Sequence, residues 1–220
     1  MTTNLIESMN GVFKGIRNLP VTVLVKPTYF RMASLFAKRD PSSIFNLLKF
    51  YALSPTNIFK VKDHFHQIHK PTLSHCNLMI RGWSQTDNPI EAIHTYNLMY
   101  RQGLIGSNLT YPFLLKTCAR ISHVFCTRMV HARVLKLGFE SVLIVSNTLI
   151  HVYAGFGELG FVCRVFDETS ERDLVSWNYL IYGYGRCKRY REVLGVFEAM
   201  RMANVVTMVK VVLACSVLGE

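Results

Sequence analysis

Apolar residues recur along the chain at the spacing of a helix face, and the stretch 174–200 shows this most clearly. Its first half, "LVSWNYLIYGYG", places apolar residues in the i, i+3, i+4, i+7 pattern of an amphipathic helix. After the polar turn "RCKRY", the same pattern appears again. The stretch is therefore predicted to form two amphipathic helices, with these apolar positions: Trp177, Leu180, Ile181 and Tyr184, then Val193, Val196, Phe197 and Met200.

The pattern returns at fixed intervals. The motif Asn-x-x-Ile-x-x-aromatic begins at Asn77, Asn147 and Asn178. The first and third lie 101 residues apart, and the second divides this interval into 70 and 31, which suits units of 35, 35 and 31 residues. A hairpin of two amphipathic helices cannot bury both apolar faces alone, so consecutive units must stack to form a continuous core. The sequence predicts an all-α protein, an α-solenoid of helix-turn-helix repeats.

Each asparagine of the motif lies beside the apolar stripe and not within it, because a helix turns by about 100° per residue. Asn178 directly follows Trp177, and the other two follow Cys76 and Ser146. In stacked units these amides are predicted to line one surface, one from each unit. The alternative is an asparagine that only caps a first turn. This fits less well, because helical residues already precede each one.

The net charge of the chain limits the classes of partner that it suits. The 220 residues carry 25 Lys and Arg against 14 Asp and Glu, and the net charge of +11 suits RNA, an acidic membrane surface or an organelle-targeted protein. No apolar run reaches the 18 residues of a membrane helix, and we expect no membrane partner. Residues 1–41 are basic with weak helical periodicity, which predicts an organelle transit peptide or an untargeted basic leader.

Motifs for catalysis are absent from the sequence. It contains no Walker, Gly-x-Ser-x-Gly, His-x-Glu or Cys-x-x-Cys motif, so we expect no enzyme, no cofactor, no metal site and no small-molecule substrate. The histidines of "HFHQIH" at 64–69 are expected to be structural or solvated, because a helix turns neighbouring ones apart. The basic turn "GRCKRYRE" is expected to be solvated, or else to contact phosphate. Six cysteines are predicted to be reduced core residues: Cys76, Cys118, Cys126, Cys163, Cys187 and Cys215.

Several segments resemble repeats of the plant pentatricopeptide repeat family, P-L-S type. "LVSWNYLIYGYGRCKRYREVLGVFEAM" is similar to a P-type repeat, "LIVSNTLIHVYAGFGELGFVCRVFDETSERD" to the 31-residue S type, and "TYPFLLKTCA" with "VHARVLKLGFES" to the 35-residue L type. The resemblance implies a right-handed superhelical α-solenoid. We assign a degenerate S-like repeat 42–72, P-like 73–107, L-like 108–142, S-like 143–173, P-like 174–206 with a shortened end, and a partial L-like repeat 207–220.

The resemblance also implies sequence-specific binding of single-stranded RNA in a mitochondrion, or alternatively a chloroplast, in support of RNA editing, splicing or stability. In that family the fifth residue of a repeat hydrogen-bonds a base edge and the last residue helps to choose the base. An amide suits this role because it donates and accepts. Apolar second residues flank the base. These roles give the candidate RNA-binding residues: Asn77 with Ser107, Asn147 with Asp173, Asn178, and the second-position residues Ile144 and Val175.

The two complete pairs carry different expectations. The Asn147–Asp173 pair resembles the family's preference for uracil, and Asn77 with Ser107 resembles a preference for pyrimidines. The L-like unit departs from the pattern, because Pro112 and Val142 occupy its two base-reading positions and neither side chain can hydrogen-bond a base.

Two further departures concern packing and length. Val162 stands where S-type repeats usually carry a small residue for close helix packing. The segments "TYPFLLKTCA" and "TMVKVVLACS" are 97 residues apart, four fewer than 101. The turn before the last unit is therefore expected to have lost about four residues, among them the last-position partner of Asn178. We expect Asn178 to have no selector, and the last apolar helix to lack its packing partner.

Three functions fit this sequence. The leading hypothesis is an RNA-binding adaptor that positions RNA without catalysis, assisted by RNA-editing or processing proteins. The second is a protein-interaction solenoid that holds a peptide in its groove, although such a groove would not require a recurrent asparagine or the Asp173 selector. The third is a degenerate or truncated relative with little activity of its own, which the shortened turn favours.

Overall fold

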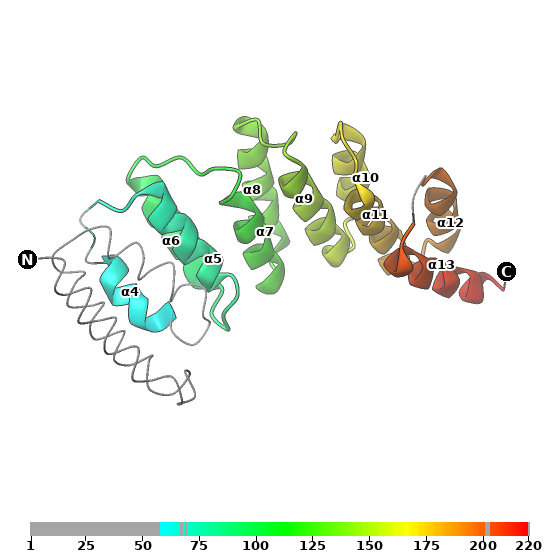
Figure 1. Cartoon of the computed structure of the whole chain (residues 1–220), viewed down its shortest axis with the longest axis horizontal. Coiled ribbons are helices and arrows are strands. Elements are labelled where there is room, and N and C mark those ends of the chain that lie inside the picture. Colours follow the sequence, from blue (N-terminus) through cyan, green and yellow to red (C-terminus); the bar gives the residue numbers. More distant parts are fainter. Residues whose placement is uncertain (1–57, 67, 69, 201–202, 220) are drawn as a thin grey trace, which may run out of the picture. The chain divides into compact units, whose positions relative to one another are not determined.

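The computed structural model describes residues 58–66, 68, 70–200 and 203–219, and every regular element among them is an α-helix (Figure 1). The predicted leader 1–41 and the predicted first helix of the 42–72 unit lie outside these residues. The ten described helices are α4 Ile58–His66, α5 Leu73–Trp83, α6 Ile90–Arg101, α7 Tyr111–Arg120, α8 Val124–Lys136, α9 Leu143–Phe156, α10 Leu159–Glu168, α11 Leu174–Arg186, α12 Tyr190–Ala199 and α13 Val205–Leu218.

Polar residues fix where the helices begin. Thr72, Asp173 and Asn204 are the N-caps of α5, α11 and α13, and each forms a capping box with the third residue of its helix. Such a cap satisfies two backbone N–H groups that a helix start leaves without partners. At the other end of α9, Gly157 adopts the left-handed conformation (φ 76°) that glycine accepts without strain. These signals divide the chain into helices of 9 to 14 residues.

The helices alternate between two roles. The first helices α5, α7, α9, α11 and α13 contact one another in that order. Each second helix, from α6 to α12, packs on the first helix of its own unit and on the first helix of the next (Figure 1). The same contact joins α4 to α5. This connectivity confirms the predicted α-solenoid of stacked helical hairpins.

The predicted apolar stripes form the core between these helices. Ile181 and Val193 are buried together with Val211 and Ala214 of α13, and Tyr184, Val196, Phe197 and Met200 pack against them. Farther back, the largest fully buried side chains are Trp83, Tyr111 and Tyr153, all from first helices. Because the cluster around Ile181 draws on two consecutive units, the unit of α11 and α12 does not bury its apolar face alone.

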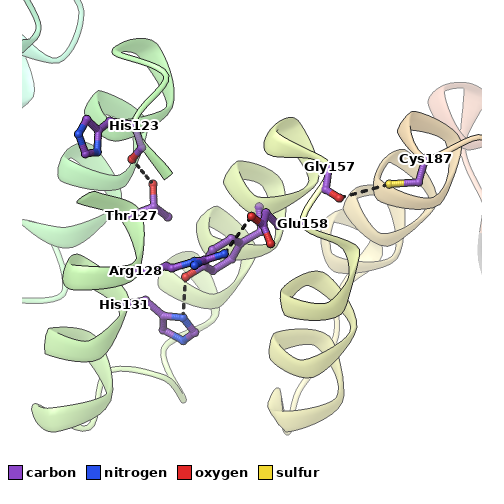
Figure 2. Close-up of polar contacts among 8 residues, drawn as sticks. His123, Thr127, Arg128, His131, Gly157, Glu158 and Cys187 are labelled. Carbon is purple, nitrogen blue, oxygen red and sulfur yellow. Dashed lines mark hydrogen bonds and ion pairs between the residues drawn. The ribbon is translucent and has the colours of Figure 1, made fainter. Parts of the chain in front are cut away.

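Polar contacts also link consecutive units. Figure 2 shows Arg128 of α8 reaching Glu158, the N-cap of α10, with Nη2 3.0 Å from Oε1. In the same region His131 lies 3.0 Å from the hydroxyl of Tyr153, and burial lowers the pKa of this histidine. The next junction carries a thiol contact, from Cys187 Sγ to the carbonyl of Gly157 at 3.5 Å.

The bulk of Val162 is accommodated by a glycine in the next unit. A Cβ atom added to Gly183 of α11 would lie 3.1 Å from Val162 Cγ1 and 3.4 Å from Ala154 Cβ. Gly183 is buried, and its lack of a side chain leaves the space that Val162 occupies. The close helix packing is kept, with the small residue on the neighbouring helix.

The structure corrects two sequence predictions. Only Cys76 and Cys118 are buried, whereas the other four cysteines are half-buried. The predicted boundary between 206 and 207 cuts α13, which already begins at Val205 behind its cap Asn204. Several apolar side chains of α13 are exposed, among them Val205, Val209, Val212 and Leu213. No helix in the described part of the chain is long and apolar enough to cross a membrane.

Candidate nucleic-acid interface

Asn147 lies in a hydrogen-bonded cluster at the junction of α9 and α11. Its Nδ2 donates to Asp173 Oδ1 at 3.0 Å, and its Oδ1 accepts the hydroxyl of Ser176 at 2.7 Å. Asp173 in turn caps α11 by accepting the backbone N–H of Ser176 at 2.9 Å. The predicted selector therefore touches the predicted base-reading amide directly, and one N–H and one lone pair of the amide remain available.

The hydrogen bonds of Asp173 keep it ionised. Burial alone would raise its pKa, but the backbone N–H of Ser176 and the amide of Asn147 stabilise the carboxylate, so the pKa lies below its ordinary value. An ionised carboxylate only accepts hydrogen bonds. This selector thus presents oxygen lone pairs and no donor.

Asn178 forms an equivalent cluster at the junction of α11 and α13. Its Oδ1 accepts the hydroxyl of Thr207 at 2.7 Å, and Thr207 also donates to Asn204 Oδ1 at 3.0 Å. Asn204 occupies the place that Asp173 has in the previous unit, as the N-cap three residues ahead of the hydroxyl residue. The four missing residues come from the turn before Asn204, and the cap itself is present, so Asn178 has a candidate last-position residue that the sequence predictions did not include. Base selection by Asn204 stays a prediction.

Asn77 has the same partners in the first complete unit. Its Nδ2 donates to Ser107 Oγ at 3.3 Å and its Oδ1 accepts the hydroxyl of Thr110 at 2.6 Å. We call these three sets the amide clusters: Asn77–Ser107–Thr110, Asn147–Asp173–Ser176 and Asn178–Asn204–Thr207. Thr110 lies directly ahead of α7, and Ser176 and Thr207 lie in the first turns of α11 and α13. The three amides therefore face the same side of the layer that the first helices form.

The L-like unit lacks an amide cluster. Pro112 stands in place of the asparagine and is buried, and Val142 stands in place of the selector. Val145, at the position of the hydroxyl residue, is apolar and fully buried. A hydroxyl residue is thus present in each of the three units that follow an asparagine, and it is absent in the unit that follows Pro112.

The amides are well covered, and their flanking residues are open. Asn147 and Asn178 are only 7% and 9% exposed, whereas Ile144 and Val175 are 56% and 43% exposed. Two further residues lie in the same register and were not among the sequence predictions, Leu109 and Val206, which are exposed and directly precede Thr110 and Thr207. Large apolar side chains beside a polar edge form a surface on which a flat ring can lie.

A second set of residues follows the amides one helical turn later. Arg81, Lys116, His151 and Tyr182 each lie four residues beyond the fifth position of their unit, on the same face of the first helices. Three more residues, Phe113, Tyr179 and Lys210, directly follow the fifth position of their units. We call all seven the cation–aromatic row: Arg81, Phe113, Lys116, His151, Tyr179, Tyr182 and Lys210.

Members of the cation–aromatic row contact one another across unit boundaries. The Arg81 guanidinium and the Lys116 ammonium lie 5.5 and 5.7 Å from the centre of the Phe113 ring. In the last units, the His151 and Tyr179 rings stack at 4.6 Å, and Lys210 lies 5.1 Å from the centre of Tyr182. Such contacts hold cations over ring faces while leaving them able to meet an anion.

The surroundings of His151 favour its neutral form. Burial is the main cause that lowers its pKa, and the positive charges of Lys116 and Lys210 lower it further. Burial also lowers the pKa of Lys210, whose ammonium donates to the backbone carbonyl of Asn178 at 3.1 Å. The row therefore offers three cations and three aromatic rings besides a neutral imidazole.

Two sequence signals could have revealed the missed residues. Alignment of the last unit on Thr110 and Thr207, instead of on the preceding helices, places Ser107 and Asn204 at the same position. The hydroxyl residues themselves follow the caps by three residues, the spacing of a capping box. The cation–aromatic row had no such signal, because its contacts depend on which helices lie side by side. No group of three or more His, Cys, Asp or Glu side chains that could hold a metal ion occurs in the described part of the chain.

Comparisons with known proteins agree with this arrangement. The family model described as PPR repeat matches residues 74–104 and 175–205, two segments at the same 101-residue offset as the asparagine motif. A mitochondrial pentatricopeptide repeat-containing protein of Arabidopsis thaliana is 37% identical over 190 residues, which cover 82% of this chain and 28% of the relative. A chloroplastic one from the same plant is 31% identical over 187 residues, which cover 82% of this chain and 31% of the relative.

A solved structure shares the fold. The pentatricopeptide repeat protein PPR10, known from maize, in complex with an 18-nt psaJ RNA element matches with a TM-score of 0.66 at 14% identity, over 86% of this chain and 29% of that chain. The chain spans less than a third of the length of these relatives. The matched repeats, the plant relatives and the shared helical arrangement show that this chain is a pentatricopeptide repeat protein.

Proposed function

We propose that this chain is a sequence-selective adaptor for single-stranded RNA that acts in organelle RNA processing and has no catalysis of its own. The observation that carries the proposal is the recurrence of the amide cluster. In three units the side-chain oxygen of an asparagine accepts a hydroxyl from the next unit, and a polar residue lies three positions ahead of that hydroxyl. A surface built only for packing would not require a hydrogen-bonded amide at each of these junctions.

Each amide cluster would bind one base. The remaining N–H and lone pair of Asn147 can form two hydrogen bonds with a base edge, while Ile144 and Val175 pack on its two faces. The acceptor-only Asp173 supports the uracil preference that the resemblance implies for this unit. Ser107 supports a pyrimidine preference beside Asn77. The L-like unit, with Pro112, would leave its base unread.

The cation–aromatic row would hold the RNA backbone. Its cations lie one helical turn from the amides on the same helix face, so a strand read by the amides would pass close to them. Cations attract phosphates regardless of sequence, whereas the amides supply the selection. In this proposal the cation–aromatic row provides affinity and the amide clusters provide base selection. Both lie on the first helices because both contact the same RNA strand.

Several further statements belong to the same proposal. The presence of two unit lengths supports the P-L-S type, because the equivalent positions Thr72, Ser107, Val142, Asp173 and Asn204 follow at intervals of 35, 35, 31 and 31 residues. The names of similar proteins support a mitochondrion, or alternatively a chloroplast. PPR10 was solved with RNA bound, which supports RNA as the partner. Three clusters read too few bases for a unique transcript, so editing or processing proteins would complete the recognition.

Neutralising the row is expected to weaken RNA binding without changing base preference. The triple variant Arg81→Gln, Lys116→Gln, Lys210→Gln should bind a randomised single-stranded RNA pool with a shallower salt dependence. The slope of log K against log salt should fall in magnitude by about 2, since each lost phosphate contact removes about 0.7. Filter binding at several salt concentrations measures this slope.

A matched control carries three neutralised cations on second helices, Arg101→Gln, Lys136→Gln and Arg164→Gln, all exposed. It has the same net charge as the triple variant and should keep the wild-type slope to within about 0.7. Equal slopes for the two triple variants would show that the row makes no special contact. Absence of RNA binding by the wild type at low salt would overturn the proposed function and favour a peptide in the groove.

A further inference from the structure

Two cysteines meet at the turn between α7 and α8. Cys118 lies in the last turns of α7, and Cys126 is the third residue of α8. Their sulfur atoms are 3.1 Å apart, and no other contact between two cysteine side chains occurs among the described residues. The two thiols need to approach by only about 1 Å to reach the 2.05 Å of a disulfide bond.

The environment of the two thiols differs. Cys118 is fully buried, while Cys126 is half-buried and so has a side open to solution. Cys126 lies in the first turn of α8, where unpaired backbone N–H groups favour a negative charge. Its backbone N–H donates to the ring of His123, the N-cap, at 3.1 Å, which fixes the turn that carries it.

Hydrogen bonding between the thiols separates their acidities. The S–H of Cys118 donates to Cys126, which lowers the pKa of Cys126 to about 7 although burial opposes the change. The same hydrogen bond and burial raise the pKa of Cys118. Cys126 is therefore the thiol with more thiolate at neutral pH, and the thiolate is the nucleophile in thiol–disulfide exchange.

We propose that Cys118 and Cys126 form a redox modification site, in which Cys126 reacts with a small-molecule disulfide such as glutathione disulfide and Cys118 resolves the product. The Cys126 thiolate attacks one sulfur of glutathione disulfide, the S–S bond breaks, and one glutathione thiolate leaves. Cys118 then loses its proton and attacks Cys126 Sγ, which releases the second glutathione. Two protein thiols are oxidised to one disulfide, and one glutathione disulfide is reduced to two glutathione thiols.

This site does not depend on RNA binding. It differs from the other half-buried cysteines, whose sulfur contacts involve no second thiol. Cys163 lies 3.3 Å from the hydroxyl of Tyr184, and Cys187 lies 3.5 Å from the carbonyl of Gly157. A mixed disulfide formed on either would have no neighbour to resolve it. Oxidation should therefore be selective for the α7–α8 turn.

Peptide mapping of the full chain tests this site directly. After treatment with glutathione disulfide at neutral pH, the protein is alkylated, digested with trypsin without reduction and analysed by mass spectrometry. Cleavage after Lys116, Arg120 and Arg128 places the cysteines on separate peptides, "TCAR" and "ISHVFCTR". We expect these two peptides joined by a disulfide. The Cys118→Ala variant should instead keep glutathione on "ISHVFCTR", and the Cys126→Ala variant should show no modification of "TCAR".

Cys187→Ala provides the matched control and should form the linked peptides at the wild-type rate. In the wild type, Cys126 should react at least about fivefold faster than Cys187, the excess expected for a thiol with pKa near ambient pH. Circular dichroism of every variant establishes that the helices are kept. Formation of the link only after unfolding, or equal rates at Cys126 and Cys187, would overturn the proposal.

Discussion

Asn147→Ala is expected to abolish base preference at one position of the bound RNA. The substitution removes both hydrogen-bonding groups that would meet the base edge, and a bidentate amide contact provides about tenfold or more in discrimination. Ile144 and Val175 remain, so RNA should still bind, with its salt dependence unchanged. Selection from a randomised single-stranded RNA pool, followed by sequencing, compares the variant with the wild type.

Folding needs a separate measurement for this variant. Loss of the amide leaves the Ser176 hydroxyl and the Asp173 carboxylate without one partner each, which we expect to cost about 1–2 kcal/mol in the free energy of unfolding. Asn97→Ala on α6 is the matched control, an exposed asparagine on a second helix. It should change neither stability nor base preference. Retention of the full preference by a folded Asn147→Ala protein would refute base reading by this amide.

Gly183→Val is expected to destabilise the protein, because Val162 and Ala154 already fill the space beside this glycine. The new Cβ would lie 3.1 Å from Val162 Cγ1, and the two added methyl groups have no space between α10 and α11. Overpacking of this kind typically costs 1–3 kcal/mol, and we expect about 2 kcal/mol. Urea unfolding followed by circular dichroism measures the change.

A double-mutant cycle shows whether Val162 is the cause. Val162→Ala alone should also destabilise, because it leaves a cavity beside Gly183. The two substitutions together should cost less than their sum by at least about 1 kcal/mol, since the alanine restores the space that valine needs. Gly185→Val, on the same helix with nothing within 4 Å of an added Cβ, should change stability by no more than about 0.5 kcal/mol. Strict additivity would contradict the close-packing argument.

Features that follow from the helical period could be predicted from the sequence. Contacts between residues of different units could mostly not be predicted from it. The asparagine motif placed the amides in register, and its partners Ser107 and Asp173 do contact Asn77 and Asn147. Their role in RNA binding stays a prediction. Asn204 was missed because the last unit was aligned on its preceding helices, whereas the cap belongs to the helix that follows.

Contacts between neighbouring helices had no counterpart in the sequence pattern. The glycine that makes room for Val162 lies 21 residues later, in another unit. The cation–aromatic row joins residues from successive first helices, such as Arg81 with Phe113, whose spacing depends on the unit lengths. The thiol pair is separated by a turn whose conformation the periodicity does not determine. Each of these contacts follows only once the stacking of the helices is known.

The most direct test of base reading by the amide clusters uses Asn204, which the sequence predictions did not include. Asn204→Asp gives the Asn178 cluster the same cap residue as the Asn147 cluster, because Asp173 and Asn204 are equivalent N-caps. Sequencing of RNA selected by the wild type and by the variant gives the preference at each position. We predict that the base read by Asn178 changes to the one read by Asn147, with all other positions unaltered. An unchanged preference at that position in a folded variant would contradict the central claim.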